Sequence, residues 1–162
     1  AFRAIPDLIT KESVLAKIRS LDKVLKAAKV SPARIGVVAL NVHCGEGGMF
    51  GREEIDVIGP AIQQAKADGF DVAGPVPPDS AFPLALRGDF RGLVLMYHDQ
   101  ANIGRKIIGR DQPGVSLFLG MPVPVVTVPH GTAYDIAWKG VAKHSMIVRA
   151  ITMTAALAGK GL

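Results

Sequence analysis

Hydrophobic residues near the start of the chain recur at intervals of three and four, which is the spacing of one face of an α-helix. Thr10 precedes this stripe and is a residue type that caps helix N-termini. The stripe consists of Val14, Leu15, Ile18, Leu21, Val24, Leu25 and Ala28. Because proline disfavours the helical conformation in the residue before it, we expect this helix to end before Ser31-Pro32.

Short apolar runs bounded by glycine and proline follow this helix, and they predict buried strands of the kind found in parallel sheets. These runs are residues 34–40, 70–73, 92–97, 115–119 and 123–128. Residues 74–79 are rich in glycine and proline and predict a turn.

Two further helices are expected, over residues 52–68 and 141–157. The first ends at Gly69 and carries Glu53, Glu54 and Asp56 in its first turns, where the helix dipole favours acidic side chains. Pro60 is expected to kink it or to split it in two. Helices that alternate with buried strands indicate an α/β fold, here a single α/β unit over residues 1–162.

The composition agrees with a folded domain, since 49% of the 162 residues are hydrophobic and 20% are charged. No apolar run approaches the length of about 20 residues that crosses a bilayer, and no secretory signal is visible. The net charge of +5 comes from scattered Lys and Arg residues, which suits anionic ligands better than nucleic acid. The single cysteine, Cys44, cannot form an internal disulfide and favours a cytoplasmic location.

Three histidines stand directly after predicted strands, and ligands of α/β sheets collect beyond the carboxyl ends of strands. His43 follows residues 34–40, His98 follows 92–97 and His130 follows 123–128. Imidazoles that converge from separate strand ends can hold a divalent ion, although a lone loop histidine is more commonly a hydrogen-bonding or capping residue.

Neighbouring residues leave further alternatives open. Cys44 stands beside His43, but adjacent side chains rarely point at one ion, so we do not expect it to be a ligand. The segment from Gly45 to Gly51 is either a phosphate-cradling loop or a turn that positions His43. His144 falls in the pattern of the last helix and is expected to be structural or exposed.

Three segments together resemble one enzyme family. They are NVHCGEGGMFGREEID at residues 41–56, MYHDQ at 96–100 and PHGTAYDIAWKGVA at 129–142. In this order and spacing they resemble the 4-hydroxythreonine-4-phosphate dehydrogenases (the PdxA family), which share the isocitrate/isopropylmalate dehydrogenase fold, an α/β/α sandwich. The resemblance covers essentially the whole chain.

The resemblance implies a metal-dependent oxidoreductase that uses NAD or NADP to oxidise the secondary alcohol of a hydroxy acid similar to 4-phosphohydroxythreonine. In the pyridoxal phosphate pathway the resulting β-keto acid then loses carbon dioxide. Carried over by position, His43 and His98 are metal ligands for Zn, Mg, Mn or Co, and Asp99 and Lys106 are catalytic. Lys106 and Ser116 bind the anionic substrate. The cofactor residues are His130, Gly131, Thr132, Ala133 and Asp135.

Two departures from the family pattern affect the interpretation. Ser116 and Val125 stand where the family has a substrate-binding asparagine and arginine, and valine cannot replace a bidentate anion clamp. Other phosphorylated four-carbon hydroxy acids and non-phosphorylated dihydrodiol carboxylates are therefore alternative substrates.

The second departure concerns length, because the family's first metal histidine should fall just before Ala1 and the N-terminal half of the subunit is missing. The chain thus resembles the C-terminal half of a subunit, inactive by itself, and a non-catalytic fragment that binds metal or nucleotide is the rival interpretation. The family resemblance implies a homodimer that shares metal ligands between subunits, with neither nucleic acid nor membrane as a partner.

Overall fold

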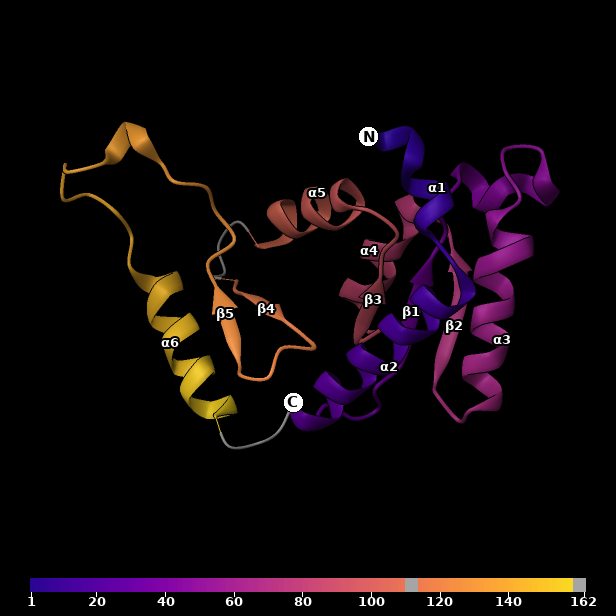
Figure 1. Ribbon diagram of the computed structural model, residues 1–162, viewed down its shortest axis with the longest axis horizontal. Helices are drawn as coiled ribbons and strands as arrows, with labels where there is room; N and C mark the ends of the chain where they lie inside the picture. Colours follow the sequence, from indigo (N-terminus) through magenta and orange to yellow (C-terminus); the bar gives the residue numbers. More distant parts are fainter. Residues whose placement is uncertain (110–113, 159–162) are drawn as a thin grey trace. The chain divides into compact units, whose positions relative to one another are not determined.

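The computed structural model describes residues 1–109 and 114–158, and the chain divides into two compact units, Ala1–Gly104 and Arg105–Leu162 (Figure 1). The first unit confirms the α/β character that the pattern predicts. The assignment of residues 1–162 to a single unit stays a prediction. Within the described ranges, none of the helices combines the length and the apolar character that a bilayer crossing requires.

The first unit is built on a parallel sheet of three strands in the order β2-β1-β3. These strands are β1 (Ile35–Val38), β2 (Val72–Val76) and β3 (Gly92–Val94). Ile35 of the central strand is in register with Val72 on one side and with Gly92 on the other, and all four residues of β1 are buried. The sequence thus predicts the first and third strands well, but the strand expected at 70–73 shares only Val72 and Ala73 with β2.

Helix α2 (Lys11–Ala27) confirms the helix expected after Thr10, and it follows two short helical turns, η1 (Phe2–Ala4) and α1 (Ile5–Leu8). The Thr10 hydroxyl accepts a hydrogen bond from the Ser13 N–H, and the Ser13 hydroxyl accepts one from the Thr10 N–H. This reciprocal capping box satisfies two N–H groups that would otherwise have no partner at the start of the helix.

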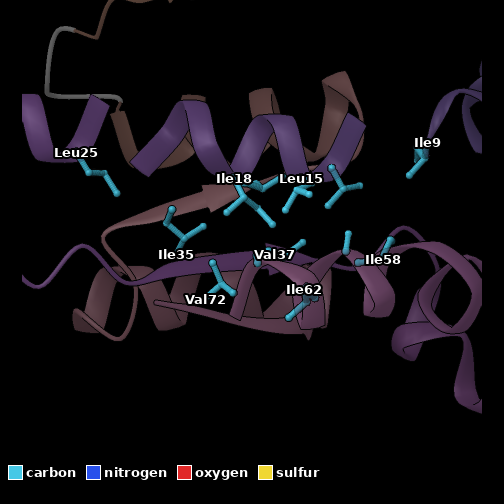
Figure 2. Packing of buried hydrophobic residues seen from close by; sticks show 13 residues of the cluster. Ile9, Leu15, Ile18, Leu25, Ile35, Val37, Ile58, Ile62 and Val72 are labelled. Atoms are coloured by element: carbon cyan, nitrogen blue, oxygen red, sulfur yellow. The ribbon is translucent and has the colours of Figure 1, made fainter. Parts of the chain in front are cut away.

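The hydrophobic core lies on both faces of the sheet because β1 points alternate side chains in opposite directions. Ile35 and Val37 pack with α2 and with α3 (Gly59–Ala67), whereas Val38 packs with Phe90 and with Ala81 of α4 (Pro78–Arg87). Figure 2 shows Leu15, Ile18 and Leu25 of α2 pointing toward Ile35 and Val37. The sheet is therefore covered by helices on both sides, as parallel sheets require.

The turn predicted for residues 74–79 is wrong, because β2 runs through Gly74 and Pro75 to Val76 and α4 follows. Gly36 pairs with Ala73 while Val38 pairs with Val76, so β2 carries one extra residue, a β-bulge. Gly74 has a φ of 144°, and a Cβ there would collide with the Val37 carbonyl oxygen. Gly74 and Pro75 therefore lie at a bulge within the strand and do not end it.

The helix predicted for residues 52–68 is split near Pro60, as expected. Its first part, η3 (Glu54–Ile58), is a π-helical turn, and the regular helix α3 follows directly. Proline has no N–H to donate, so the helical ladder is interrupted at this point. Gly69, with a φ of 87°, follows the end of α3 as predicted.

Helix α5 (His98–Ile108) begins four residues after β3 ends, and the sequence pattern did not predict it or α4. The division between the two units falls within α5, between Gly104 and Arg105.

The second unit contains β4 (Ser116–Phe118), β5 (Val125–Thr127), η5 (Tyr134–Ile136) and α6 (Ser145–Leu157). The strands expected at 115–119 and 123–128 are present, but they form their own antiparallel pair. Helix α6 packs on β5 and begins four residues later than the pattern predicts. Ala150 is the only buried residue among those described from Arg105 onward.

Candidate metal and cofactor sites

The carboxyl ends of β1 and β3 carry the two histidines predicted to bind metal. β1 and β3 are parallel neighbours, so their carboxyl ends lie at one edge of the sheet. His43 lies in η2 (Val42–Gly48), which follows β1, and His98 opens α5. Their side chains are 67% and 81% exposed, so both imidazoles are accessible to an ion or to another protein segment.

Carboxylates accompany both imidazoles. His98 Nδ1 lies 2.7 Å from Asp99 Oδ1, and His43 Nδ1 lies 3.6 Å from Glu46 Oε2. A carboxylate on one ring nitrogen fixes the tautomer and directs the other nitrogen, Nε2, to a metal. Within residues 1–109 and 114–158, no three His, Cys, Asp or Glu side chains gather closely enough to hold an ion by themselves.

The corner between β1 and η2 is held by one buried carboxylate, that of Glu54, which is 5% exposed. Its Oε1 accepts hydrogen bonds from the N–H groups of Leu40 and Asn41 at 2.8 and 2.9 Å. Its Oε2 accepts one from Asn41 Nδ2 at 2.9 Å, and Asn41 Nδ2 also donates to Glu53 Oε2 at 2.6 Å. The sequence indicates only a dipole interaction for Glu54, so this contact was missed.

The loop after this corner has an unusual backbone, because all five residues from His43 to Gly47 have positive φ angles between 43° and 76°. Each non-glycine residue in this left-handed region costs about 1–2 kcal/mol. A Cβ on Gly45 would lie 2.6 Å from the Gly51 carbonyl oxygen and 2.8 Å from Glu54 Oε2. Gly45 is thus closely packed while Gly47 is open to solvent, and the fixed position of Gly45 favours the turn that positions His43 over the phosphate cradle.

Gln100 links the ends of the two strands. Its Nε2 donates to the Ala39 carbonyl oxygen at 2.9 Å, and its Oε1 accepts from the Met96 N–H at 2.9 Å. The side chain thereby sets the spacing between the segments that carry His43 and His98. Its position in the MYHDQ segment was visible in the sequence, but its role was not.

Cys44 is part of this loop, and its Sγ donates to the Pro75 carbonyl oxygen at 3.6 Å. Burial, followed by the negative charges of Glu54 and Asp79, raises the pKa of the Cys44 thiol. The thiolate is the form that binds metals and reacts with electrophiles. The environment therefore favours a neutral, unreactive thiol.

We expect iodoacetamide to alkylate Cys44 in the folded protein more slowly than it alkylates the same residue in urea, at every pH below the raised pKa. The rate should rise only at alkaline pH, because a raised pKa shifts thiolate formation upward. Mass spectrometry of timed, quenched samples measures both rates. Equal rates in the folded and unfolded protein at pH 8 would contradict this prediction.

The predicted substrate residues lie in α5 and in the β4-β5 pair. Lys106 is exposed in the last turn of α5, and Ser116 opens β4 opposite Thr127. Phe118 is opposite Val125, so Ser116 and Val125 lie on the same face of the two-stranded ribbon. The differences from the family pattern at Ser116 and Val125 therefore change one surface.

Four of the five predicted cofactor residues line a hollow of about 690 Å³ in the second unit. His130, Gly131, Thr132 and Ala133 line it, and His130 Nδ1 lies 2.8 Å from the Gly131 carbonyl oxygen. Asp135 is exposed in η5 and does not line this hollow. The other lining residues are mostly apolar: Ile136, Ala137, Trp138, Gly140, Val141, Ala142, Lys143, Ser145 and Met146.

The family model described as pyridoxal phosphate biosynthetic protein PdxA matches residues 1–154. The chain belongs to the PdxA family. It is 43% identical over 158 residues to a 4-hydroxythreonine-4-phosphate dehydrogenase of Geobacter metallireducens, with 98% of this chain and 46% of that protein covered. It is 39% identical over 158 residues to a D-threonate 4-phosphate dehydrogenase of Pectobacterium atrosepticum, with coverages of 98% and 48%.

The structure of a 4-hydroxythreonine-4-phosphate dehydrogenase from Klebsiella pneumoniae aligns with a TM-score of 0.82 and 36% identity. The alignment covers 95% of this chain and 46% of the Klebsiella protein. The PdxA chain therefore has the isocitrate/isopropylmalate dehydrogenase-like fold expected from its motifs. It spans about half the length of the curated relatives it matches.

Proposed function

We propose that the full-length protein containing this chain is a metal-dependent NAD(P) dehydrogenase that oxidises the secondary alcohol of a phosphorylated four-carbon hydroxy acid. The observation that carries the proposal is the placement of His43 and His98 after two adjacent parallel strands. The names of the PdxA relatives support the substrate class, since they act on 4-hydroxythreonine 4-phosphate and D-threonate 4-phosphate.

Of the ions expected, Zn, Mg, Mn or Co, the two imidazole donors suit Zn best, because Mg and Mn prefer oxygen ligands. His43 and His98 would hold the ion together with ligands from the rest of the subunit or from the second subunit of a homodimer. A bound divalent cation supplies Lewis-acid polarisation of the substrate hydroxyl. Asp99 holds the Nδ1 side of the His98 ring at 2.7 Å and so keeps Nε2 available to the ion.

The remaining residues bind and orient the reactants. Lys106 provides a positive point charge for a carboxylate or phosphate, and the Ser116 hydroxyl donates a hydrogen bond to the same substrate. The hollow at His130, Gly131, Thr132 and Ala133 would receive the adenosine end of NAD or NADP, with Asp135 nearby in sequence. The nicotinamide carries out the redox step, so the task of these residues is placement. A carboxylate β to the new ketone would then leave as carbon dioxide, and the electrons of the broken bond would form an enolate that takes up a proton from water.

A second candidate substrate is a dihydrodiol carboxylate without a phosphate group. Val125 favours it, because Val125 shares its ribbon face with Ser116 and cannot bind a phosphate as the family's arginine does. A non-catalytic chain that binds metal or nucleotide is the remaining alternative. The homodimer and the cytoplasmic location stay predictions.

A substrate screen of the full-length protein tests the proposal. We expect NAD(P) reduction with phosphorylated hydroxy acids, a loss of activity with a chelator, and recovery with added Zn²⁺ or Co²⁺. Activity only with dihydrodiol carboxylates would favour the second substrate class. Undiminished activity in a metal-free preparation would contradict the metal site, and an absence of turnover with both classes would favour the non-catalytic alternative.

A further inference from the structure

Among the described residues two charged side chains are buried, those of Asp22 and Glu54, and their polar partners lie at different distances along the chain. Asp22 is 8% exposed and pairs with Lys26 of its own helix at 2.8 Å. Glu54 instead receives N–H donors from Leu40 and Asn41, which lie fourteen and thirteen residues earlier in the chain. Burying a carboxylate is costly unless hydrogen bonds compensate for the lost water, so these bonds indicate a specific structural task.

The contacts of Glu54 lie on both sides of His43 along the chain. Before His43, the carboxylate accepts three N–H donors from Leu40 and Asn41. After His43, Oε2 lies so close to Gly45 that a Cβ there would be only 2.8 Å away. Gly45 is in turn fixed by the Phe50 N–H, which donates to its carbonyl oxygen at 3.1 Å. One carboxylate therefore sets the position of the loop segment that carries the imidazole.

The backbone of Glu54 is itself held in place. The Gly59 N–H donates to the Glu54 carbonyl oxygen across the wide turn η3. A Cβ on Gly59 would lie 2.7 Å from that oxygen, so glycine permits the close approach. Ile58, which ends the same turn, is completely buried in the core. The carboxylate thus extends from an anchored turn, as a group that positions another segment must.

From these contacts we infer that Glu54 is a positioning residue that sets the place of the His43 imidazole for a divalent cation. The inference rests on the proposed function, because it needs His43 to be a metal ligand. His43, Cys44 and Glu46 all adopt left-handed backbone angles that each cost about 1–2 kcal/mol. Without the carboxylate this loop is free to relax, and the imidazole moves away from the position that the other ligands require.

Calorimetric titration of the metal-free, full-length protein with Co²⁺ tests this role directly. We expect Glu54→Ala to weaken Co²⁺ binding by about 10- to 100-fold, the usual effect of losing a group that orients a ligand. Glu54→Gln should weaken binding by only about threefold to tenfold, because its amide oxygen still accepts the main-chain N–H bonds of Leu40 and Asn41, whereas its amide nitrogen cannot accept the bond from Asn41 Nδ2. Circular dichroism confirms that each variant is folded.

Asp22→Ala is the matched control, because it removes the other buried carboxylate at a place remote from the loop. It is expected to lower thermal stability without changing the Co²⁺ affinity. If Glu54→Ala fails to fold, Asn41→Ala replaces it. This variant removes the two hydrogen bonds that Asn41 Nδ2 donates to Glu54 and Glu53, keeps the main-chain bonds, and should weaken binding about threefold to tenfold.

His43→Ala separates the inference from the proposed function. If His43→Ala loses Co²⁺ affinity while folded Glu54→Ala, or its substitute Asn41→Ala, binds like the Asp22→Ala control, the positioning role is overturned and the metal site stands. If His43→Ala itself binds Co²⁺ with unchanged affinity, His43 is not a ligand. In that case the metal site fails, and the role of Glu54 fails with it.

Discussion

Replacement of His98 by alanine in the full-length protein is expected to lower turnover by about 10²- to 10³-fold while leaving the fold intact. Lewis-acid stabilisation is worth several kcal/mol, and each 1.36 kcal/mol is a factor of ten in rate. The side chain is 81% exposed and makes its polar contact with the neighbouring Asp99, so few packing interactions are lost. Initial rates of NAD(P)H formation, with thermal unfolding of the same samples, measure both parts of the prediction.

His144→Ala is the control for this experiment. His144 is an exposed histidine that precedes α6 and makes no side-chain capping hydrogen bond. Its replacement should leave turnover within about twofold of the unmodified protein, since surface substitutions are usually within about 0.5 kcal/mol. Equal turnover in the His98 and His144 variants would remove His98 from the site.

Replacement of Ile18 by alanine should lower the free energy of unfolding by about 3 kcal/mol, within a range of about 2–5 kcal/mol for buried isoleucine. Ile18 has no exposed surface and lies in the core between α2 and the sheet (Figure 2). The loss combines the transfer of buried methyl groups with the cavity left behind. Urea unfolding of the full-length protein measures this loss: the midpoint should fall, while the slope of the free energy of unfolding against urea concentration stays unchanged.

Lys23→Ala provides the comparison on the same helix. Lys23 is exposed on α2, and alanine is a good helix former, so the change should stay within about 0.5 kcal/mol. A similar midpoint for Ile18→Ala and Lys23→Ala would show that the α2 interface contributes little to stability.

The sequence was most informative where one physical signal dominated. The stripe from Val14 to Ala28 predicted α2 because a helix with one buried face must repeat apolar residues at that spacing. The apolar run around Ile35 predicted the central strand because β1 is buried on both faces. Both elements are confirmed with boundaries within a few residues.

Other elements depended on pairing between distant residues, which a local pattern does not contain. Gly74 and Pro75 resemble a turn locally, yet the ladder between Val38 and Val76 keeps them within β2. The antiparallel pairing of β4 with β5 could not be deduced from two short apolar runs, because such runs suit either strand direction.

The same distinction applies to the candidate site. His43 and His98 were found because the ends of parallel strands are a general location for ligands. Glu54 and Gln100 were not assigned a role, because their partners, the main-chain groups of Leu40, Asn41 and Ala39, carry no side-chain signal in the sequence. Acidic side chains near a helix start are usually explained by their interaction with the helix dipole. This explanation was sufficient for Glu54 in the sequence, so its main-chain contacts were not predicted.

The left-handed run from His43 to Gly47 also limits what protein engineers can transplant. A graft of the histidine loop alone into another α/β scaffold would lose the carboxylate beneath it and the glutamine beside it. The smallest portable module is therefore the strand, the loop and the π-helical turn together, residues 35–59, with a host glutamine placed at the neighbouring strand end. A shorter insert would keep the imidazole but would lose the contacts that fix its position.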